Sequence, residues 1–298
     1  DRLINNKDRY EAHYKIKNQF ENLCQDKDFI FNSLKDCISK QTFWAKPDNL
    51  IFPLHISGDI IISINLFVPI RDGAKNITQD NIHHHGWRLL TTGVISGNGY
   101  ETINFERNSH EIKKSNHICL KVKEDYKHII GSSKFLDSRM AHVVFHPKET
   151  CATLALWSAD KPMINQSFKR FLTPFPAIRK VAATAIHKTG LNNYLGLNPV
   201  KGLYFHPEGG KIVETINYNK PFDGNYNEIT QCYFKFFEQI GFIKEQHFKN
   251  SKQFFNKFAL SLYDKLISGN EIEDLGIWGN LRRRFTKNQI LLAIDNNK

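Results

Sequence analysis

The chain has 298 residues, of which 41% are hydrophobic, and its 41 lysines and arginines outnumber 30 aspartates and glutamates to give a net charge of +11. This length and apolar content suffice to bury a sizeable core and exclude an intrinsically disordered chain. The longest apolar run, residues 59–70, is far shorter than the roughly 20 residues needed to span a bilayer. We expect a soluble protein with no signal peptide and no membrane segment.

The cysteines and the distribution of charge indicate the cellular compartment and the kind of partner. The five cysteines are scattered, odd in number and without C-x-x-C spacing, which favours a reducing compartment and predicts a cytoplasmic protein without disulfides. The basic residues are dispersed, and the one tight cluster is the arginine triplet at 282–284. A solvated surface explains such a pattern better than a nucleic-acid contact.

The pattern of apolar residues changes once in the first part of the chain. Residues 8–40 carry apolar side chains at helical spacing and predict two amphipathic helices. From residue 42 to 160, short β-branched runs alternate with turn residues, as in "IIISINLFV", "LLTTGVI", "SGNG" and "CATLALWS". Seven or eight short strands at this spacing predict a closed or sandwich-like all-β unit.

After Pro162 the pattern becomes mostly helical. Helices are predicted over 177–195, 227–241 and 247–269, with a loop and room for one hairpin over 201–226. The sequence is therefore divided into an N-terminal helical segment (1–41), a β-barrel (42–162) and a mostly α-helical C-terminal region (163–298). The helical region is expected to cover the barrel or to form a second lobe.

Three consecutive histidines stand at the start of a predicted strand. Side chains alternate faces in a strand, so His83 and His85 share a face, about 7 Å apart, and His84 points the other way. Two such imidazoles can bind one cation if another strand supplies a third ligand, and His142 is available for that role. From the residues alone, a metal site and a merely polar strand end remain open.

Two longer stretches resemble a known family. "HHHGWRLLTTGVISGNGYETINFE" has the H-x-H pattern followed twelve residues after His85 by Gly97, and "HVVFHPKETCATLALWSADKP" opens on His142. Together they resemble the two motifs of the cupin superfamily and, within it, the three-histidine thiol dioxygenases of the cysteine dioxygenase type. The resemblance covers roughly residues 50–162. It implies a mainly β core, a double-stranded β-helix or jelly-roll barrel.

The resemblance also implies a metal and its ligands. It makes His83, His85 and His142 the three ligands of a mononuclear metal, most simply Fe(II), with Mn, Ni and Zn as alternatives. No Glu or Asp follows the H-x-H pattern over residues 87–92, which favours three histidines over a set with a carboxylate. The family's cysteine/tyrosine pair corresponds to Leu90 and Trp157 here, so cysteine itself is a doubtful substrate.

Other residues are candidates for contact with a substrate. A carboxylated substrate would need a cation, for which Arg71 ranks first, with Arg139 third and Arg88 below Arg71 because alternation turns it away from the ligands. Trp87 and Thr91 share the ligands' face and are expected to line the pocket, although core packing explains them equally well.

Three functions follow from these observations. The leading one is a metal-dependent oxidoreductase, a non-haem iron dioxygenase that uses O2 on a small molecule such as an amino acid, a thiol or a tethered derivative. The second keeps the metal for isomerase, lyase or hydrolytic chemistry without O2. The third is a non-catalytic cupin that binds a small ligand or an anionic polymer through its basic surface.

Overall fold

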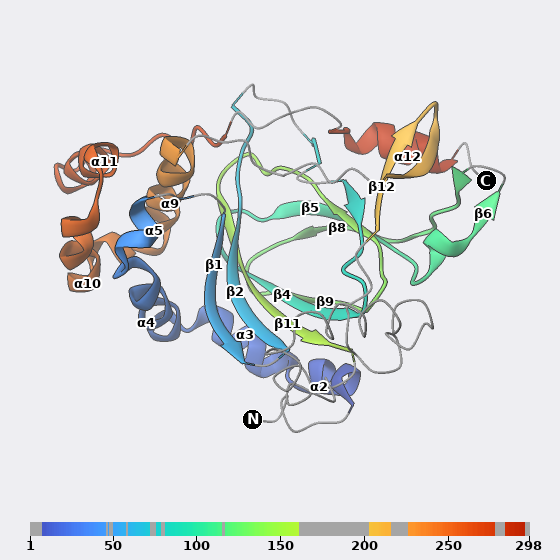
Figure 1. Cartoon of the computed structure of the whole chain (residues 1–298), viewed down its shortest axis with the longest axis horizontal. Helices are drawn as coiled ribbons and strands as arrows, with labels where there is room; N and C mark the ends of the chain where they lie inside the picture. The colour runs from blue at the N-terminus through green and yellow to red at the C-terminus, as the bar shows by residue number, and fades with distance from the viewer. Residues whose placement is uncertain are drawn as a thin grey trace, which may run out of the picture.

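The computed structural model describes residues 8–45, 47, 50–57, 59–71, 76–78, 81–114, 117–160, 203–215, 226–277 and 284–295. Figure 1 shows a two-layered β core with helices gathered mainly at one side. No helix among the described residues is both long and apolar enough to cross a membrane.

The N-terminal part is helical, as predicted, but it is broken more often than expected. Asp8 accepts a hydrogen bond from the backbone of Glu11 at the start of the first helix, and Asp26 does the same for Phe29 at the start of the third. Such side chains satisfy backbone N–H groups that have no partner within the helix. The helices are α2 (Arg9–Lys15), α3 (Lys17–Gln25), α4 (Lys27–Ile38) and α5 (Gln41–Ala45).

Two antiparallel sheets make up the core. The five-stranded sheet has the order β1-β2-β11-β4-β9, and its strands are β1 (Ile51–Ser57), β2 (Ile60–Phe67), β4 (Arg88–Ser96), β9 (Ser133–Leu136) and β11 (Cys151–Ala159). The six-stranded sheet has the order β13-β12-β3-β10-β5-β8, with β3 (Ile82–His83), β5 (Tyr100–Phe105), β8 (Val122–His128), β10 (His142–Val144), β12 (Tyr204–Glu208) and β13 (Lys211–Thr215). A short pair, β6 (Lys113–Lys114) and β7 (His117–Ile118), forms a separate two-stranded sheet next to the 3-10 helix η1 (Ser109–Glu111) and β13.

The two sheets face each other. Side chains from both sheets line one cavity between them. The chain crosses repeatedly between them: β3 and β5 belong to one sheet, whereas β4 between them belongs to the other. Gly97 and Gly99, both with positive φ, make the tight turn from β4 to β5. The core is a cupin-like double-stranded β-helix, which confirms the predicted fold class.

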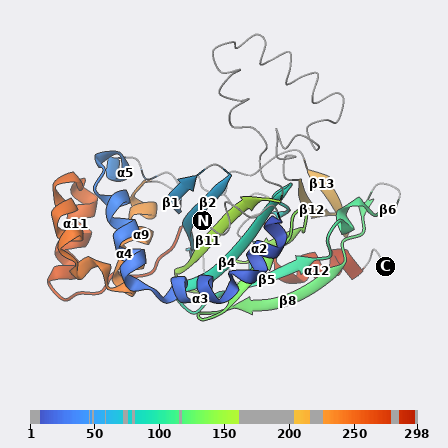
Figure 2. The ribbon, with the colours of Figure 1, turned by 90° about the horizontal axis from the view of Figure 1, so that it is seen from below.

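The C-terminal helices cover the outer face of the five-stranded sheet together with α4 and α5 (Figures 1 and 2). The predicted helix 227–241 is confirmed as α9 (Tyr226–Ile240), whereas the single helix expected over 247–269 is divided. The division falls at Asn256, whose side chain caps the last helix by accepting from Ala259. The pieces are α10 (Gln246–Asn250), the 3-10 helix η3 (Ser251–Phe254) and α11 (Lys257–Ile267), and another 3-10 helix, η2 (Phe242–Lys244), precedes them.

A β-hairpin and a last helix extend the other sheet. β12 and β13 form the hairpin that the sequence allowed within 201–226, and β12 pairs with β3. Helix α12 (Lys287–Asp295) packs on this hairpin, at the end of the molecule opposite α9–α11 (Figure 1). The predicted helix 177–195 and most of the arginine triplet lie outside the described residues. The three-part division of the chain stays a prediction, and one apolar core contains residues from all three segments.

Candidate metal centre

The three predicted ligands meet at one end of the barrel. His83 ends β3 and His142 begins β10, and the two residues are direct partners in the antiparallel ladder. Directly opposed side chains in such a ladder lie on the same face of the sheet. His85 follows β3 as the chain leaves for the opposite sheet, and it brings its ring back toward the other two.

The geometry of the three imidazoles fits a single ion. One ring nitrogen from each histidine lies within 4.8 Å of the other two, and Nε2 of His85 is 3.2 Å from Nε2 of His142. Two nitrogens bound at about 2.0–2.1 Å to one ion are themselves about 3.0–3.4 Å apart, so that pair already has the required separation. In the part of the chain that the structure describes, this is the one group of three or more potential ligands found to be close enough to hold a metal.

The protonation of the cluster also suits a cation. Burial, together with the neighbouring histidines, holds the pKa of His85 and of His142 well below the usual value, so both rings are neutral at pH 7. His83 Nδ1 donates to the backbone carbonyl of Asn81 at 2.8 Å, which leaves Nε2 as the nitrogen with a lone pair. Three imidazole nitrogens from one site form a donor set that binds divalent transition metals.

The middle histidine of the triplet points away, as alternation predicts. His84 stacks on His110 with ring centroids 4.6 Å apart, and its Nδ1 accepts a hydrogen bond from the backbone of Gly86. Gly86 has a φ of 64°, a conformation that glycine adopts without strain. This turn redirects the chain from one sheet to the other directly after the ligands.

The histidines open into a cavity of about 230 Å³ between the two sheets. Trp157 stands closest to them on the opposite sheet, and its ring centroid is 4.5 Å from that of His85. The lining residues are Leu50, Ile51, Asn65, Leu66, Phe67, His83, His85, Leu90, Thr92, Tyr100, Thr102, Tyr126, Leu136, His142, Val144 and Trp157. Leu90 and Trp157 are ladder partners, and both face this cavity.

The structure corrects the expected position of Thr91. It lies on the outer face of β4, where its hydroxyl is 2.7 Å from Nδ1 of His13 on α2, and Thr92 lines the cavity in its place. The prediction extended one alternating pattern from His83 through to Thr91. The pattern does not persist, because β3 ends at His83 and the turn at Gly86 resets the register before β4 begins.

Trp87 and Arg71 also lie outside the cavity lining. Trp87 belongs to the same turn, and the guanidinium of Arg139 lies over its ring at 5.0 Å. Arg71 follows β2 after the chain has left the barrel, and its guanidinium is 4.0 Å from the carboxylate of Glu228 on α9. The expected cation for a carboxylated substrate is thus turned toward α9, and none of Arg71, Trp87 and Thr91 is brought to the three histidines.

Several cavity residues were not singled out from the sequence. Tyr100, Thr102 and Tyr126 come from β5 and β8, and Asn65 comes from β2. A signal was present in "IIISINLFV", where Ser63 and Asn65 interrupt an apolar strand at alternate positions. Which face of the strand such residues occupy depends on pairing with distant strands, which the sequence does not state.

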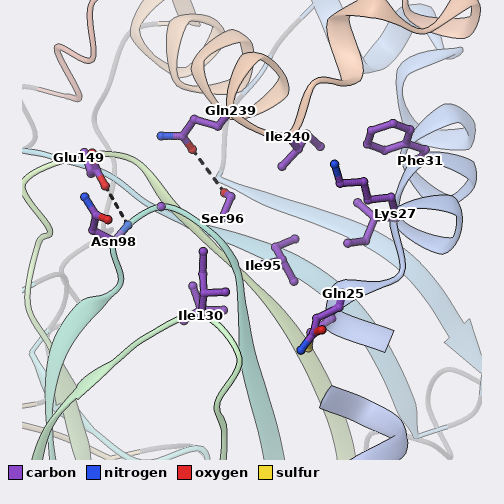
Figure 3. Close-up of a pocket in the computed structure, with 14 residues that line it drawn as sticks. Gln25, Lys27, Phe31, Ile95, Ser96, Asn98, Ile130, Glu149, Gln239 and Ile240 are labelled. Atoms are coloured by element: carbon purple, nitrogen blue, oxygen red, sulfur yellow. Dashed lines mark hydrogen bonds between the residues drawn. The ribbon is translucent and has the colours of Figure 1, made fainter. Parts of the chain in front are cut away.

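A second, larger hollow of about 640 Å³ lies outside the barrel, between α3, α4, the end of β4 and the end of α9 (Figure 3). Its polar groups bind one another: the backbone of Asn98 donates to Glu149 at 2.8 Å, and Ser96 donates to Gln239 at 3.4 Å. The three histidines are not part of it, and we assign no function to it.

Comparisons with known proteins give only matches of low similarity. No family model matches the chain, and no curated protein matches its sequence. An uncharacterised conserved protein with a double-stranded β-helix domain from Klebsiella pneumoniae matches with 12% identity and a TM-score of 0.26, over 41% of this chain and 88% of that one.

Two enzymes match over smaller shares of their length. A DMSP lyase from Ruegeria pomeroyi has 12% identity and a TM-score of 0.24, over 35% of this chain and 40% of the lyase. An oxalate oxidase has 12% identity and a TM-score of 0.26, over 37% of this chain and 47% of the oxidase. The chain therefore covers less than half of either enzyme, and we draw no conclusion on activity from such low similarity. The resemblance to the cysteine dioxygenase type stays a prediction.

Proposed function

We propose that this protein is a metal-dependent enzyme of the cupin superfamily, in which His83, His85 and His142 hold Fe(II), and that it oxidises a small molecule with O2. One observation carries the proposal: three imidazoles converge at a cavity between the two sheets. Neutral ligands leave the full 2+ charge on the ion. A bound Fe(II) would supply open coordination positions at which a substrate donor and O2 can meet.

The chain's own residues prepare the site for this role. The carbonyl of Asn81 fixes the tautomer and orientation of His83. Tyr204 stacks on the His83 ring, with ring centroids 5.7 Å apart. Trp157 and Leu90 close the cavity opposite the ligands, and Leu136 packs against them. Apolar walls of this kind keep water away from the reacting atoms.

The test is elemental analysis of protein purified without a histidine tag, followed by oxygen-uptake measurements on the iron-loaded form. We expect about one iron per chain, and loss of most of it in His83→Ala and His142→Ala, because each change removes one of three ligands. His55→Ala, an exposed histidine on β1, is the matched control and keeps its metal. Circular dichroism reports whether each variant is folded.

Other outcomes contradict the proposal in different ways. Zinc, manganese or nickel at the same stoichiometry, with no O2 uptake after iron loading, points to isomerase, lyase or hydrolytic chemistry at the same three histidines. Metal content that is unchanged in both histidine variants, or no metal after anaerobic addition of Fe(II), removes the metal centre and favours a non-catalytic ligand-binding protein.

A further inference from the structure

The cavity walls also indicate what kind of molecule would enter. We infer that the body of the substrate, meaning everything beyond the atom that binds the metal, is a compact uncharged group with the size of a single substituted ring. The inference rests on the proposed function, since it takes the three histidines as the place where the substrate's donor atom is held.

Ladder partners order the cavity wall in layers. In the layer of the ligands, His83 and His142 lie across from Leu90 and Trp157 of the other sheet. The next layer on the histidine sheet is Val144, Thr102 and Tyr126, in which Thr102 is the ladder partner of both other residues. A substrate held at the ligands would therefore place its next atoms against these side chains.

The far end of the cavity is aromatic. Phe67 and Tyr100 stack with ring centroids 4.3 Å apart, and both line the cavity. Tyr100 comes from β5 and Phe67 from β2, so the two rings join the sheets at the end away from the histidines. Aromatic surfaces at this position favour an apolar or aromatic group over a charged one.

Most polar atoms of the wall already have partners within the protein. The Thr102 hydroxyl donates to the carbonyl of Val143 at 2.8 Å, and the Asn65 amide oxygen accepts from Ser63 at 3.0 Å. The hydroxyl of Tyr126 accepts from Asn104 at 3.4 Å. The hydroxyl of Tyr100 lies 3.0 Å from a ring nitrogen of His128. The wall therefore presents mainly methyl groups and ring faces to a ligand.

The charged side chains near the cavity are paired with other groups of the protein. No Asp, Glu, Lys or Arg is among the described residues that line the cavity, and burial holds the pKa of His85 and of His142 well below the usual value. The nearby Lys134 lies over the ring of Tyr126 at 4.1 Å and forms an ion pair with Glu124 at 3.1 Å, and Arg71 faces Glu228. A carboxylate in the body of a substrate would lose its hydration without gaining a cation from these walls, which is costly.

The volume sets the size of the group. An apolar cavity of about 150 Å³ takes up benzene, so a cavity of about 230 Å³ accommodates one ring with a few further atoms. It is smaller than the roughly 300–1,000 Å³ of pockets for drug-sized ligands. Size and wall chemistry thus agree on a compact body without charge.

Two thiols with the same metal-binding atom and different bodies test the inference. Benzyl mercaptan has an uncharged ring, whereas 3-mercaptopropionate has a carboxylate. Both are titrated into protein loaded with Co(II), and the sulfur-to-cobalt absorption bands report binding. We expect benzyl mercaptan to bind at least tenfold more tightly. Equal or tighter binding of 3-mercaptopropionate would overturn the inference while leaving the metal centre intact.

A cavity-filling variant locates the effect. Val144→Phe adds a ring inside the cavity and should weaken benzyl mercaptan at least tenfold without loss of cobalt, whereas Ile56→Phe adds a ring at a site on β1 that is 67% exposed and should leave binding unchanged. Unchanged binding in Val144→Phe contradicts the inference. Failure of cobalt to bind, or cobalt content unaffected by His142→Ala, is a failure of the proposed function instead.

Discussion

The two faces of the five-stranded sheet show how one set of strands serves two purposes. On the outer face, Phe52 packs against the rings of Tyr233, Phe236 and Phe237 from α9, in a core that also includes helices from both ends of the chain. On the inner face, the same strands present Asn65, Thr92 and Trp157 to a cavity. Alternation along each strand sends successive side chains to opposite faces, so the same sheet packs against helices on one side and lines the cavity on the other.

Because of this difference, one face of the sheet contributes mainly to stability and the other carries the candidate site. A filled aromatic core gains free energy from burial and close packing, and a hollow forgoes both. The outer face therefore supplies free energy of folding that the inner face, with its cavity and its buried histidines, does not. Substitutions on the two faces should consequently affect different measurements.

The largest effect on stability is expected for Phe237→Ala, on helix α9, which covers the outer face of the sheet. Phe237 is fully buried and its ring meets those of Trp44, Phe242 and Phe248, so its removal leaves a cavity and should cost about 3–5 kcal/mol of unfolding free energy. Urea denaturation measures the loss, and metal content of the folded fraction should not change. Leu292→Ala, at a side chain that is 63% exposed, is the control. A loss below 1 kcal/mol, or a loss of metal without destabilisation, would contradict the separation of the two faces.

An intermediate effect is expected at Gly93, where α3 approaches the outer face of β4. A Cβ atom at this position would lie 2.5 Å from Sγ of Cys24, so Gly93→Ala forces the helix away from the strand. Overpacking of this kind costs about 1–3 kcal/mol. Cys24→Ala in the same chain makes room and should restore part of the stability, which a double-mutant cycle by urea denaturation measures. Strictly additive costs would show that the contact is not responsible.

The smallest effect is a pH dependence from His13, which joins α2 to the outer face. Its ring nitrogens are 2.7 Å from the Thr91 hydroxyl and 2.9 Å from the Ser158 hydroxyl, and burial lowers its pKa to about 4. The unfolded chain takes up this proton near pH 6.5, so the stabilisation is present above that pH and is lost as the pH falls toward 4. His13 alone should contribute a loss of about 1–2 kcal/mol between pH 7 and pH 5.

His13→Gln tests this contribution, because the replacement does not titrate in that range. Unfolding free energies at pH 7 and pH 5 should differ less in the variant than in the parent protein. Burial also lowers the pKa of His128 to about 4 and of His146 to about 3, so some dependence on pH remains. His247→Gln, an exposed histidine on α10, serves as the control. An identical pH dependence in His13→Gln and the parent would show that His13 contributes nothing.

The sequence predicted the strands and the candidate ligands better than it predicted which face of a strand each side chain occupies. Short strands between turn residues, and the H-x-H pattern with a distant His142, were enough to predict a barrel and three candidate ligands that the structure brings within 4.8 Å. These features depend on local patterning and on one long-range pairing. The ligands could be predicted because alternation places His83 and His85 on one face and the second motif opens on His142.

The rest of the site depends on events that local patterning does not record. Thr91 faces outward because the turn at Gly86 changes the register between two strands, and Arg71 is directed to Glu228, which lies on a helix far along the chain. The cavity wall required the pairing of Val144, Thr102 and Tyr126 across three strands. The contact of Arg71 and the pairing of the three strands are long-range, and the change of register at Gly86 interrupts the alternation on which a prediction from local pattern depends.

The shortest strand of the core has a consequence for the order in which the protein assembles. β3 is only two residues long, and it is held on one side by β10 and on the other by β12, a strand that is synthesised much later. Pairing between segments so far apart in the chain forms slowly. The strand that carries His83 therefore has both of its ladder neighbours only once β12 has been synthesised, which ties a candidate metal ligand to the C-terminal part of the chain.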